Sequence, residues 1–196
     1  LNDHFASVTY DTHSGKAIED KKAELQDLVD RYNALDDDKQ LAALTQVFDG
    51  KPYARSQATL DALDAALTEV EAAAEALAAI NTYLSGTYES ISKAGVDELQ
   101  DELTTLGLYS AEYIALAPAD GPERHTAVFR DLWNNKPADG YDLETLTTYF
   151  DAMVGTRLKT QESMDKVNNA TSVEDLDGIS WVTLLNDHFA SVTYAT

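Results

Sequence analysis

The chain has 196 residues, of which 44% are apolar and 25% charged, a composition typical of a folded protein rather than a disordered one. Its 35 acidic residues outnumber its 14 basic residues and give a net charge of −21, which argues against binding to nucleic acid or to an anionic membrane surface. The absence of cysteine excludes disulfides, thiol catalysis and cysteine-based zinc sites.

Two helices are predicted in the first 50 residues. Ala17–Leu35 carries apolar residues at helical spacing along one face, and Lys39–Phe48 does the same with Leu41, Leu44, Val47 and Phe48. The run Asp36-Asp37-Asp38 between them lacks the alternating ligands and glycine of a calcium-binding EF-hand loop. We interpret it as a connection whose negative charge favours the start of the second helix.

The strongest periodicity lies over Ser56–Ile91, where seam residues recur at alternating steps of three and four. This heptad pattern and the many alanines predict a long helix with a narrow apolar stripe, and Gly86 is the position at which we expect the helix to break or bend. The seam consists of Leu60, Leu63, Leu67, Val70, Ala74, Leu77, Asn81, Leu84, Tyr88 and Ile91.

Four further helices follow in chain order. A short one is predicted over Val96–Leu106, and another after Pro122, a residue favoured in the first turn. Asp142 can cap a long helix that runs toward Val167, and Ser172 with Asp175 resembles a capping box. Because no run of alternating β-branched residues is found, the predicted fold class is all-α.

The decapeptide LNDHFASVTY occurs twice, at residues 1–10 and at residues 185–194. Its second copy continues a predicted helical face formed by Trp181, Leu184, Leu185, Phe189 and Val192. The first copy lacks the residues that would begin this helix. We therefore expect a tandem repeat of 184 residues, in which residue 184 of one copy is followed by residue 1 of the next. The alternative is a duplication of a terminal segment.

A weaker repeat lies inside this period. Val47-Phe48-Asp49-Gly50-Lys51-Pro52 resembles Leu132-Trp133-Asn134-Asn135-Lys136-Pro137, and Gly95-Val96-Asp97-Glu98-Leu99 resembles Ser172-Val173-Glu174-Asp175-Leu176. The pattern predicts a helical module A over residues 1–94, a module B over 95–171, and the beginning of the next module A over 172–196. We expect elongated antiparallel bundles of three to four helices in tandem, with each Lys-Pro pair acting as a turn.

Two segments resemble a known class of protein. Residues 167–176, Val-Asn-Asn-Ala-Thr-Ser-Val-Glu-Asp-Leu, and the alanine-rich stretch Thr59–Leu84 are similar to tandem helical repeats of giant Gram-positive surface proteins, including FIVAR and albumin-binding modules. The resemblance implies a three-helix type of fold, an extracellular, cell-wall-anchored location and a stalk or adhesive role. It identifies no functional residue.

Motifs for catalysis or cofactor binding are absent from the sequence. His4, His13, His125 and His188 do not have metal-ligand spacing, and no nucleotide-binding or nucleophile motif occurs. We therefore predict no enzyme activity, no catalytic residue, no metal site and no cofactor. No apolar run is long enough to predict membrane insertion.

Three function classes are considered, of which the third, an enzyme or regulatory bundle, is disfavoured by the lack of catalytic motifs. The first is a structural spacer that projects a binding domain away from the cell, with neighbouring repeats of the same chain as partners. The alternative is an adhesive module that binds a host protein or glycan through a bundle face, for which Tyr53, Tyr109, Tyr113 and Tyr141 are candidate contact residues.

Overall fold

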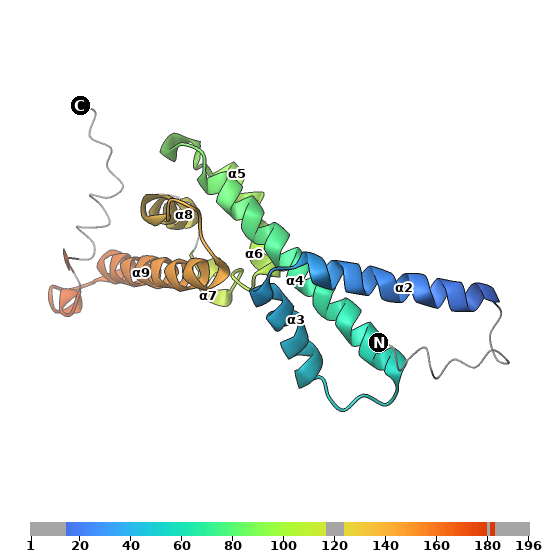
Figure 1. Ribbon diagram of the computed structural model, residues 1–196. Coiled ribbons are helices and arrows are strands. Elements are labelled where there is room, and N and C mark those ends of the chain that lie inside the picture. Colours follow the sequence, from blue (N-terminus) through green and yellow to red (C-terminus); the bar gives the residue numbers. More distant parts are fainter. Residues whose placement is uncertain (1–14, 117–123, 180, 183–196) are drawn as a thin grey trace. The chain divides into compact units, whose positions relative to one another are not determined.

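The computed structural model describes residues 15–116, 124–179 and 181–182. Every regular element in these ranges is a helix, and no strand occurs in them, which confirms the all-α fold class (Figure 1). The arrangement of tandem bundles stays a prediction, and both copies of LNDHFASVTY lie outside the described residues, as does Pro122.

The chain forms two compact units, Leu1–Ala74 and Glu75–Thr196, and we call them unit 1 and unit 2. Their boundary falls within helix α4 (Ser56–Leu84), so the first part of this helix belongs to unit 1 and the last part to unit 2. Modules A and B are units of sequence repetition, and their limits stay a prediction.

Unit 1 contains α2 (Gly15–Ala34), α3 (Asp37–Asp49) and the first part of α4. Its core is small and comes from all three helices. The buried apolar residues are Leu25, Leu28, Ala43, Leu60, Ala66, Leu67 and Val70. This core confirms that the predicted stripes of α2 and α4 face inward, since burial of one apolar stripe per helix is what stabilises such a bundle.

The turn between α2 and α3 is fixed by side chains. The Asp36 carboxylate accepts a hydrogen bond from the Lys39 N–H at 3.0 Å and so caps α3, with Asp37 and Asp38 in the first turn. The Gln40 amide donates to the carbonyls of Tyr32 and Leu35 at 3.1 and 3.0 Å, and thereby satisfies the end of α2. The predicted role of the aspartate run is confirmed.

Arg31 joins α2 to α4. Its guanidinium contacts Asp64 at 2.5 Å and Glu71 at 2.9 Å, and it donates to the Thr68 hydroxyl at 3.0 Å. Hydrogen bonds to Glu71 and then to Asp64 raise the pKa of Arg31. The network offsets part of the repulsion among acidic residues along these two helices.

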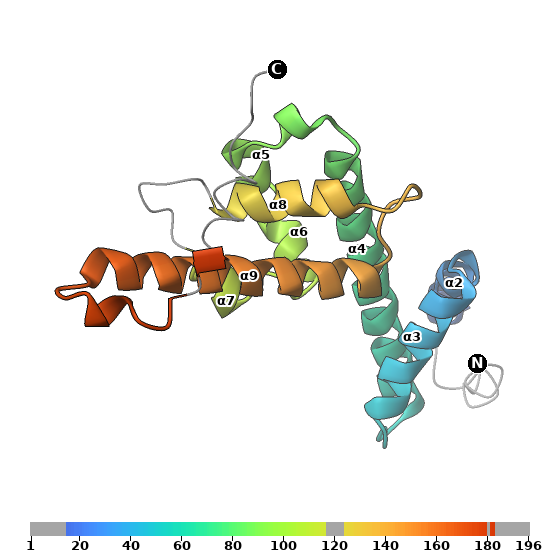
Figure 2. The same cartoon turned by 90° about the vertical axis from the view of Figure 1, so that its left-hand side faces the viewer.

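Unit 2 contains the rest of α4, then η1 (Tyr88–Ser90), α5 (Lys93–Asp97), α6 (Gln100–Thr105), α7 (Ala111–Ile114), α8 (Arg124–Asn135), α9 (Leu143–Asn169) and η2 (Glu174–Leu176). Helices α8 and α9 form an antiparallel hairpin, with α5 packed against α8 and α7 against α9 (Figure 2). Residues from α4 through α9 share one core around Phe129 and Phe150.

One helix prediction in unit 2 is confirmed and one needs correction. The long helix ends at Leu84, just before the break expected at Gly86, and Ser85 and Gly86 make tight turn hydrogen bonds to Thr82 and Tyr83. The single helix expected over Val96–Leu106 is two short helices that meet at Leu99.

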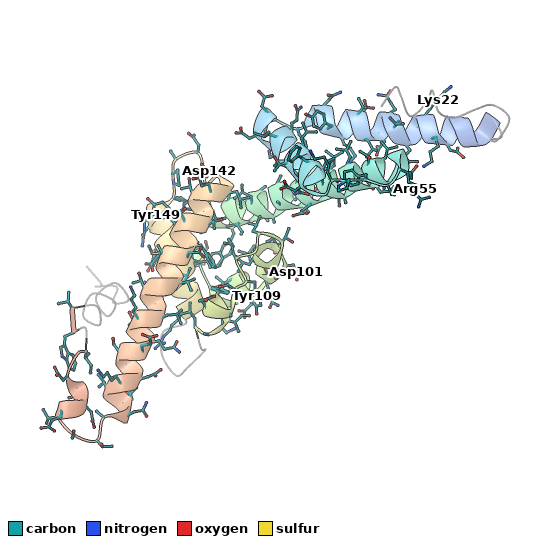
Figure 3. All side chains as sticks on the ribbon, turned by 90° about the horizontal axis from the view of Figure 1, so that it is seen from below. Lys22, Arg55, Asp101, Tyr109, Asp142 and Tyr149 are labelled. Carbon is teal, nitrogen blue, oxygen red and sulfur yellow. The ribbon has the colours of Figure 1, made fainter. Side chains whose placement is uncertain are left out.

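The start of α9 follows its prediction more closely. The Asp142 carboxylate caps this helix by accepting from the Thr145 N–H at 2.7 Å; Figure 3 labels Asp142. The Asp175 carboxylate accepts from the N–H groups of Thr171 and Ser172, both at 2.8 Å, as the acidic residue of a capping box does. Only one helical turn, η2, follows it.

Candidate functional site

The face of α3 that carries Leu41, Leu44 and Phe48 is exposed to solvent. These side chains are 65%, 46% and 63% exposed, and their spacing places them on one stripe of the helix. The buried residue of α3, Ala43, lies on the opposite face. Three large apolar side chains on one stripe form an apolar surface, which is more informative than single exposed residues. We call Leu41, Leu44 and Phe48 the α3 stripe.

A second group of exposed apolar side chains lies near the end of the described chain. It includes Met164 on α9, Val173 just before η2, and the neighbouring Trp181 and Val182. Val173 is 79% exposed and Trp181 50% exposed. Exposure of apolar surface to water is unfavourable by about 25 cal/mol for each Å². Burial of these side chains against a partner would therefore be favourable.

The two Lys-Pro turns share a local structure. In unit 1, the Lys51 ammonium lies 3.1 Å from the centroid of the Phe48 ring, and in unit 2 the Lys136 ammonium lies 5.0 Å from the centroid of the Trp133 ring. In both turns a tyrosine hydroxyl closes the preceding helix: Tyr53 donates to the Val47 carbonyl at 2.7 Å.

The matching bond in unit 2 runs from the Tyr141 hydroxyl to the Leu132 carbonyl at 2.8 Å. Val47 and Leu132 occupy the same position of the two similar hexapeptides. The sequence similarity between the hexapeptides therefore corresponds to a repeated arrangement of a short helix, a lysine–aromatic contact, a tyrosine–carbonyl hydrogen bond and a long helix.

Four hydrogen bonds from three side chains join the α4 end of unit 2 to the last part of α8 and the turn that follows it. The Asn81 amide donates to the Tyr141 carbonyl at 2.9 Å and accepts from the Tyr141 N–H at 2.8 Å. The Trp133 indole donates to the Gly86 carbonyl at 2.8 Å, and the Lys136 ammonium donates to the Leu84 carbonyl. These bonds satisfy carbonyls at and just after the end of α4, which would otherwise lack partners.

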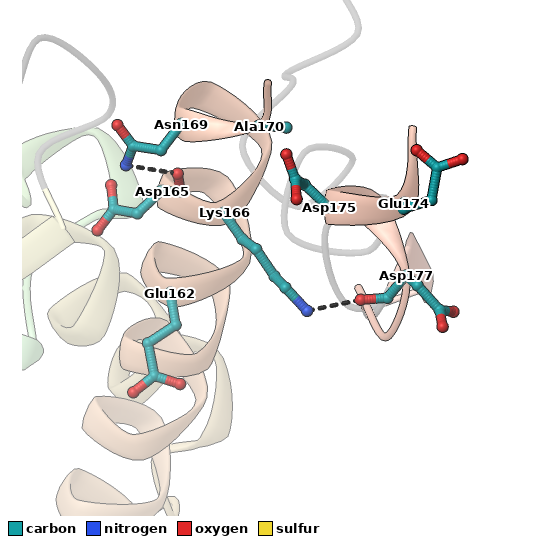
Figure 4. A pocket seen from close by; sticks show the side chains of 8 residues that line it. All are labelled: Glu162, Asp165, Lys166, Asn169, Ala170, Glu174, Asp175 and Asp177. Atoms are coloured by element: carbon teal, nitrogen blue, oxygen red, sulfur yellow. Dashed lines mark hydrogen bonds between the residues drawn. The ribbon is translucent and has the colours of Figure 1, made fainter. Parts of the chain in front are cut away.

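An open pocket of about 560 Å³ lies between the end of α9 and η2 (Figure 4). Five carboxylates line it, from Glu162, Asp165, Glu174, Asp175 and Asp177, together with one ammonium from Lys166. That ammonium donates to the Asp177 carbonyl at 2.6 Å, and so connects η2 to α9.

The carboxylates of this pocket act mainly on the local backbone. Hydrogen bonds from the Thr171 and Ser172 N–H groups lower the pKa of Asp175, and the pKa of Glu174 is lowered by its own backbone N–H. Neither shift brings a carboxyl group toward neutral pH, where a general acid or base would need it. The arrangement accounts for a folded turn and does not assemble a reactive pair.

The most buried ion pair among the described residues joins the two helices of the α8–α9 hairpin. The Arg157 guanidinium, on α9, contacts Asp131 of α8 at 2.5 Å and is 8% exposed. Nearby in the same unit, the His125 ring stacks on Tyr113 with centroids 4.2 Å apart, and its Nε2 lies 2.8 Å from the Tyr113 carbonyl. Both arrangements hold elements of the core together.

The tyrosines considered for ligand binding do not form an exposed patch. Tyr113 and Tyr141 are buried, and Tyr53 and Tyr109 are half-buried. Burial raises the pKa of Tyr141 to about 12 and raises that of Tyr113 further. The exposed apolar surface lies instead on α3, where the sequence indicated a shared face but not whether anything covers it. His4, His13 and His188 lie outside the described residues.

Searches for two other kinds of site give negative results. In the part of the chain that the structure describes, no group of three or more histidine, aspartate or glutamate side chains is arranged to hold a metal ion. None of the described helices is both long and apolar enough to cross a membrane. Comparison with known proteins gives no match: no family model, curated protein or solved structure is significantly similar to the chain.

Proposed function

We propose that the chain is one period of a tandem helical array that serves as a stalk, or spacer, of a long bacterial surface adhesin. The array is extracellular and anchored to the cell wall through regions outside this chain, and it projects a binding domain away from the cell. The observation that carries the proposal is the identity of LNDHFASVTY at two positions 184 residues apart.

The repeated turn structure supports the proposal. The Lys51-Pro52 and Lys136-Pro137 turns carry equivalent lysine–aromatic contacts and tyrosine–carbonyl hydrogen bonds. Repetition at two scales, within the period and between periods, is typical of proteins whose length is set by copy number. A charge of −21 in each copy adds repulsion between neighbouring copies, which disfavours folding back of the array.

In the part of the chain that the structure describes, the ionisable groups with shifted pKa values have structural roles. These groups are helix caps, members of ion pairs or buried tyrosines, and in each case a hydrogen bond, an ion pair or burial explains the pKa shift. As a spacer the chain needs no substrate or cofactor. Its requirements are a stable fold and a defined connection between copies.

X-ray scattering on proteins of one, two and three copies, joined so that residue 184 precedes residue 1, tests the proposal. We expect the maximum dimension to grow nearly linearly with copy number. Growth with the one-third power of copy number, as for a globule, would refute the spacer function.

The alternative function is adhesion to a host protein or glycan through a bundle face. The observation that favours it is the exposed α3 stripe. Binding of a purified serum protein, matrix protein or glycan by a single copy, lost when Leu41 and Leu44 are both replaced by glutamine, would support adhesion over the spacer function.

A further inference from the structure

We propose that the α3 stripe of each copy is covered by the preceding copy of the array, through the end of its α9, its η2 turn and the segment that begins at Trp181. The occupant is thus residues 164–184 of one copy, continued by residues 1–10 of the next. This inference rests on the proposed tandem function, and it assigns the α3 stripe and the exposed apolar side chains near the end of the described chain to one interface between consecutive copies.

The first argument comes from the helix that corresponds to α3 in unit 2. Counted back from the shared Lys-Pro pair, Leu44 corresponds to Phe129 and Leu41 to Thr126, both on α8. Phe129 and Thr126 are 0% and 1% exposed. The same face of the equivalent helix is therefore covered in unit 2 and uncovered in unit 1.

Helix α9 covers part of α8, with the Phe150 and Phe129 ring centroids 6.3 Å apart, and elements from the chain before α8 cover the rest. The Tyr83 ring meets Phe129 edge-on, with centroids 5.9 Å apart, and the Arg130 guanidinium donates to the Ile91 carbonyl at 3.2 Å. Helix α5 packs directly against α8. The part of the cover that precedes α8 in the chain thus consists of the end of a long helix, a turn and a short helix.

The second argument comes from the sequence similarity between α5 and the η2 region. Val96 of α5 corresponds to Val173 in the similar pentapeptides. Val96 is 2% exposed in the core that it shares with α8, whereas Val173 is 79% exposed. In unit 2, the segment that follows the long helix α4 precedes α8 in the chain. In a tandem array, the segment that follows the long helix α9 of one copy would likewise precede α3 of the next copy. The second half of the interface is therefore present at the end of each copy.

The third argument is the composition of the last part of the proposed occupant, from Ile179 on, since the first part, residues 164–178, carries five charged side chains. Residues 179–196 contain a single charged residue, Asp187, in a chain that is 25% charged. Such a segment is suited to an apolar surface and would be poorly suited to a solvated tail. Only four residues separate Tyr10 from Gly15, the first residue of α2.

The test uses a two-copy protein, residues 1–184 followed by residues 1–196. Leu41→Gln and Leu44→Gln are introduced together, either in the first copy or in the second. Only the α3 of the second copy has a preceding copy to cover it. We expect the substitutions to lower the melting temperature by roughly 5 °C or more when placed in the second copy, and by less than about 2 °C in the first.

The matched control is Leu143→Gln, which replaces a leucine that is 42% exposed in unit 2 and is expected to have equal effects in both copies. A second measurement combines Val173→Gln in the first copy with Leu44→Gln in the second. We expect the effects of these two changes to be non-additive, because each removes one side of the same contact. Far-UV circular dichroism checks that every variant folds.

Equal effects of the α3 substitutions in both copies, or additive effects in the second measurement, would overturn the interface. The result is separable from the spacer function. If the maximum dimension grows nearly linearly but the loss of melting temperature does not depend on copy position, the spacer function is supported and this interface is refuted. If the loss of melting temperature depends on copy position but the maximum dimension does not grow in this way, the interface is supported and the spacer function is refuted.

Discussion

Replacement of Asn81 by alanine tests how unit 2 holds its long helices in register. The Asn81 amide makes two hydrogen bonds to the backbone of Tyr141, a residue that is 4% exposed. Each bond contributes about 1 kcal/mol, and leaving a buried N–H or C=O without a partner adds a penalty. We therefore expect Asn81→Ala to reduce the free energy of unfolding by about 2–3 kcal/mol.

Urea denaturation of the Trp181→Phe protein, followed by Trp133 fluorescence, measures this loss in unit 2. With a slope of about 1–3 kcal/mol/M, the midpoint should fall by roughly 0.7–3 M. The control is Asn134→Ala, which replaces an exposed asparagine on α8 and should change the midpoint little. Equal midpoints for Asn81→Ala and Asn134→Ala would refute the structural role of the amide.

Three further predictions concern single side chains. Arg31→Met should destabilise unit 1 by about 1–2 kcal/mol, more at low salt than at high salt, whereas Arg55→Met at an exposed position should have little effect in the same thermal melts. Gly140→Ala should cost more stability than Gly107→Ala in urea denaturation: both glycines have positive φ, but only at Gly140 would an added Cβ approach a side-chain oxygen, to 3.0 Å. The Thr145 N–H lowers the pKa of Asp142 below its ordinary 3.8, so the carboxylate contributes stability above about pH 3.8 that is lost as the pH falls through the folded pKa; Asp142→Asn should reduce the acid dependence of the melting temperature.

Local signals in the sequence predict most of the helices. The caps at Asp36 and Asp142 lie within three residues of the N–H groups that they bind, and the apolar spacing of α2, α4 and α9 follows one helical face. Such features depend on neighbouring residues, and for this reason they can be recognised without knowledge of the tertiary structure.

The end of α4 depends on residues far away in the sequence. Trp133 and Lys136 bind the carbonyls of Gly86 and Leu84, across separations of 47 and 52 residues. A heptad pattern that continues to Ile91 contains no sign of these partners. Ile91 is still fully buried, so its place in the apolar pattern is correct although the helical seam stops before it.

The α3 stripe is a second feature that the spacing of apolar residues predicts only in part. Spacing places Leu41, Leu44 and Phe48 on one stripe, but it does not indicate whether that stripe meets the unit's own core. Ala43, on the other face, is the buried contact, and a single small residue gives a weak signal in the sequence. The equivalent face of α8 is buried by neighbouring helices, and the α3 stripe has no such cover within the described residues of unit 1.

The most direct test of the tandem account is chemical denaturation of one-, two- and three-copy proteins under identical conditions, with helicity as the signal. If consecutive copies share an interface and continue one another's structure, the midpoint should rise from one copy to two and again to three, because each added junction contributes stability to its neighbours. A midpoint that stays constant with copy number would show that the copies fold independently, and it would contradict the account.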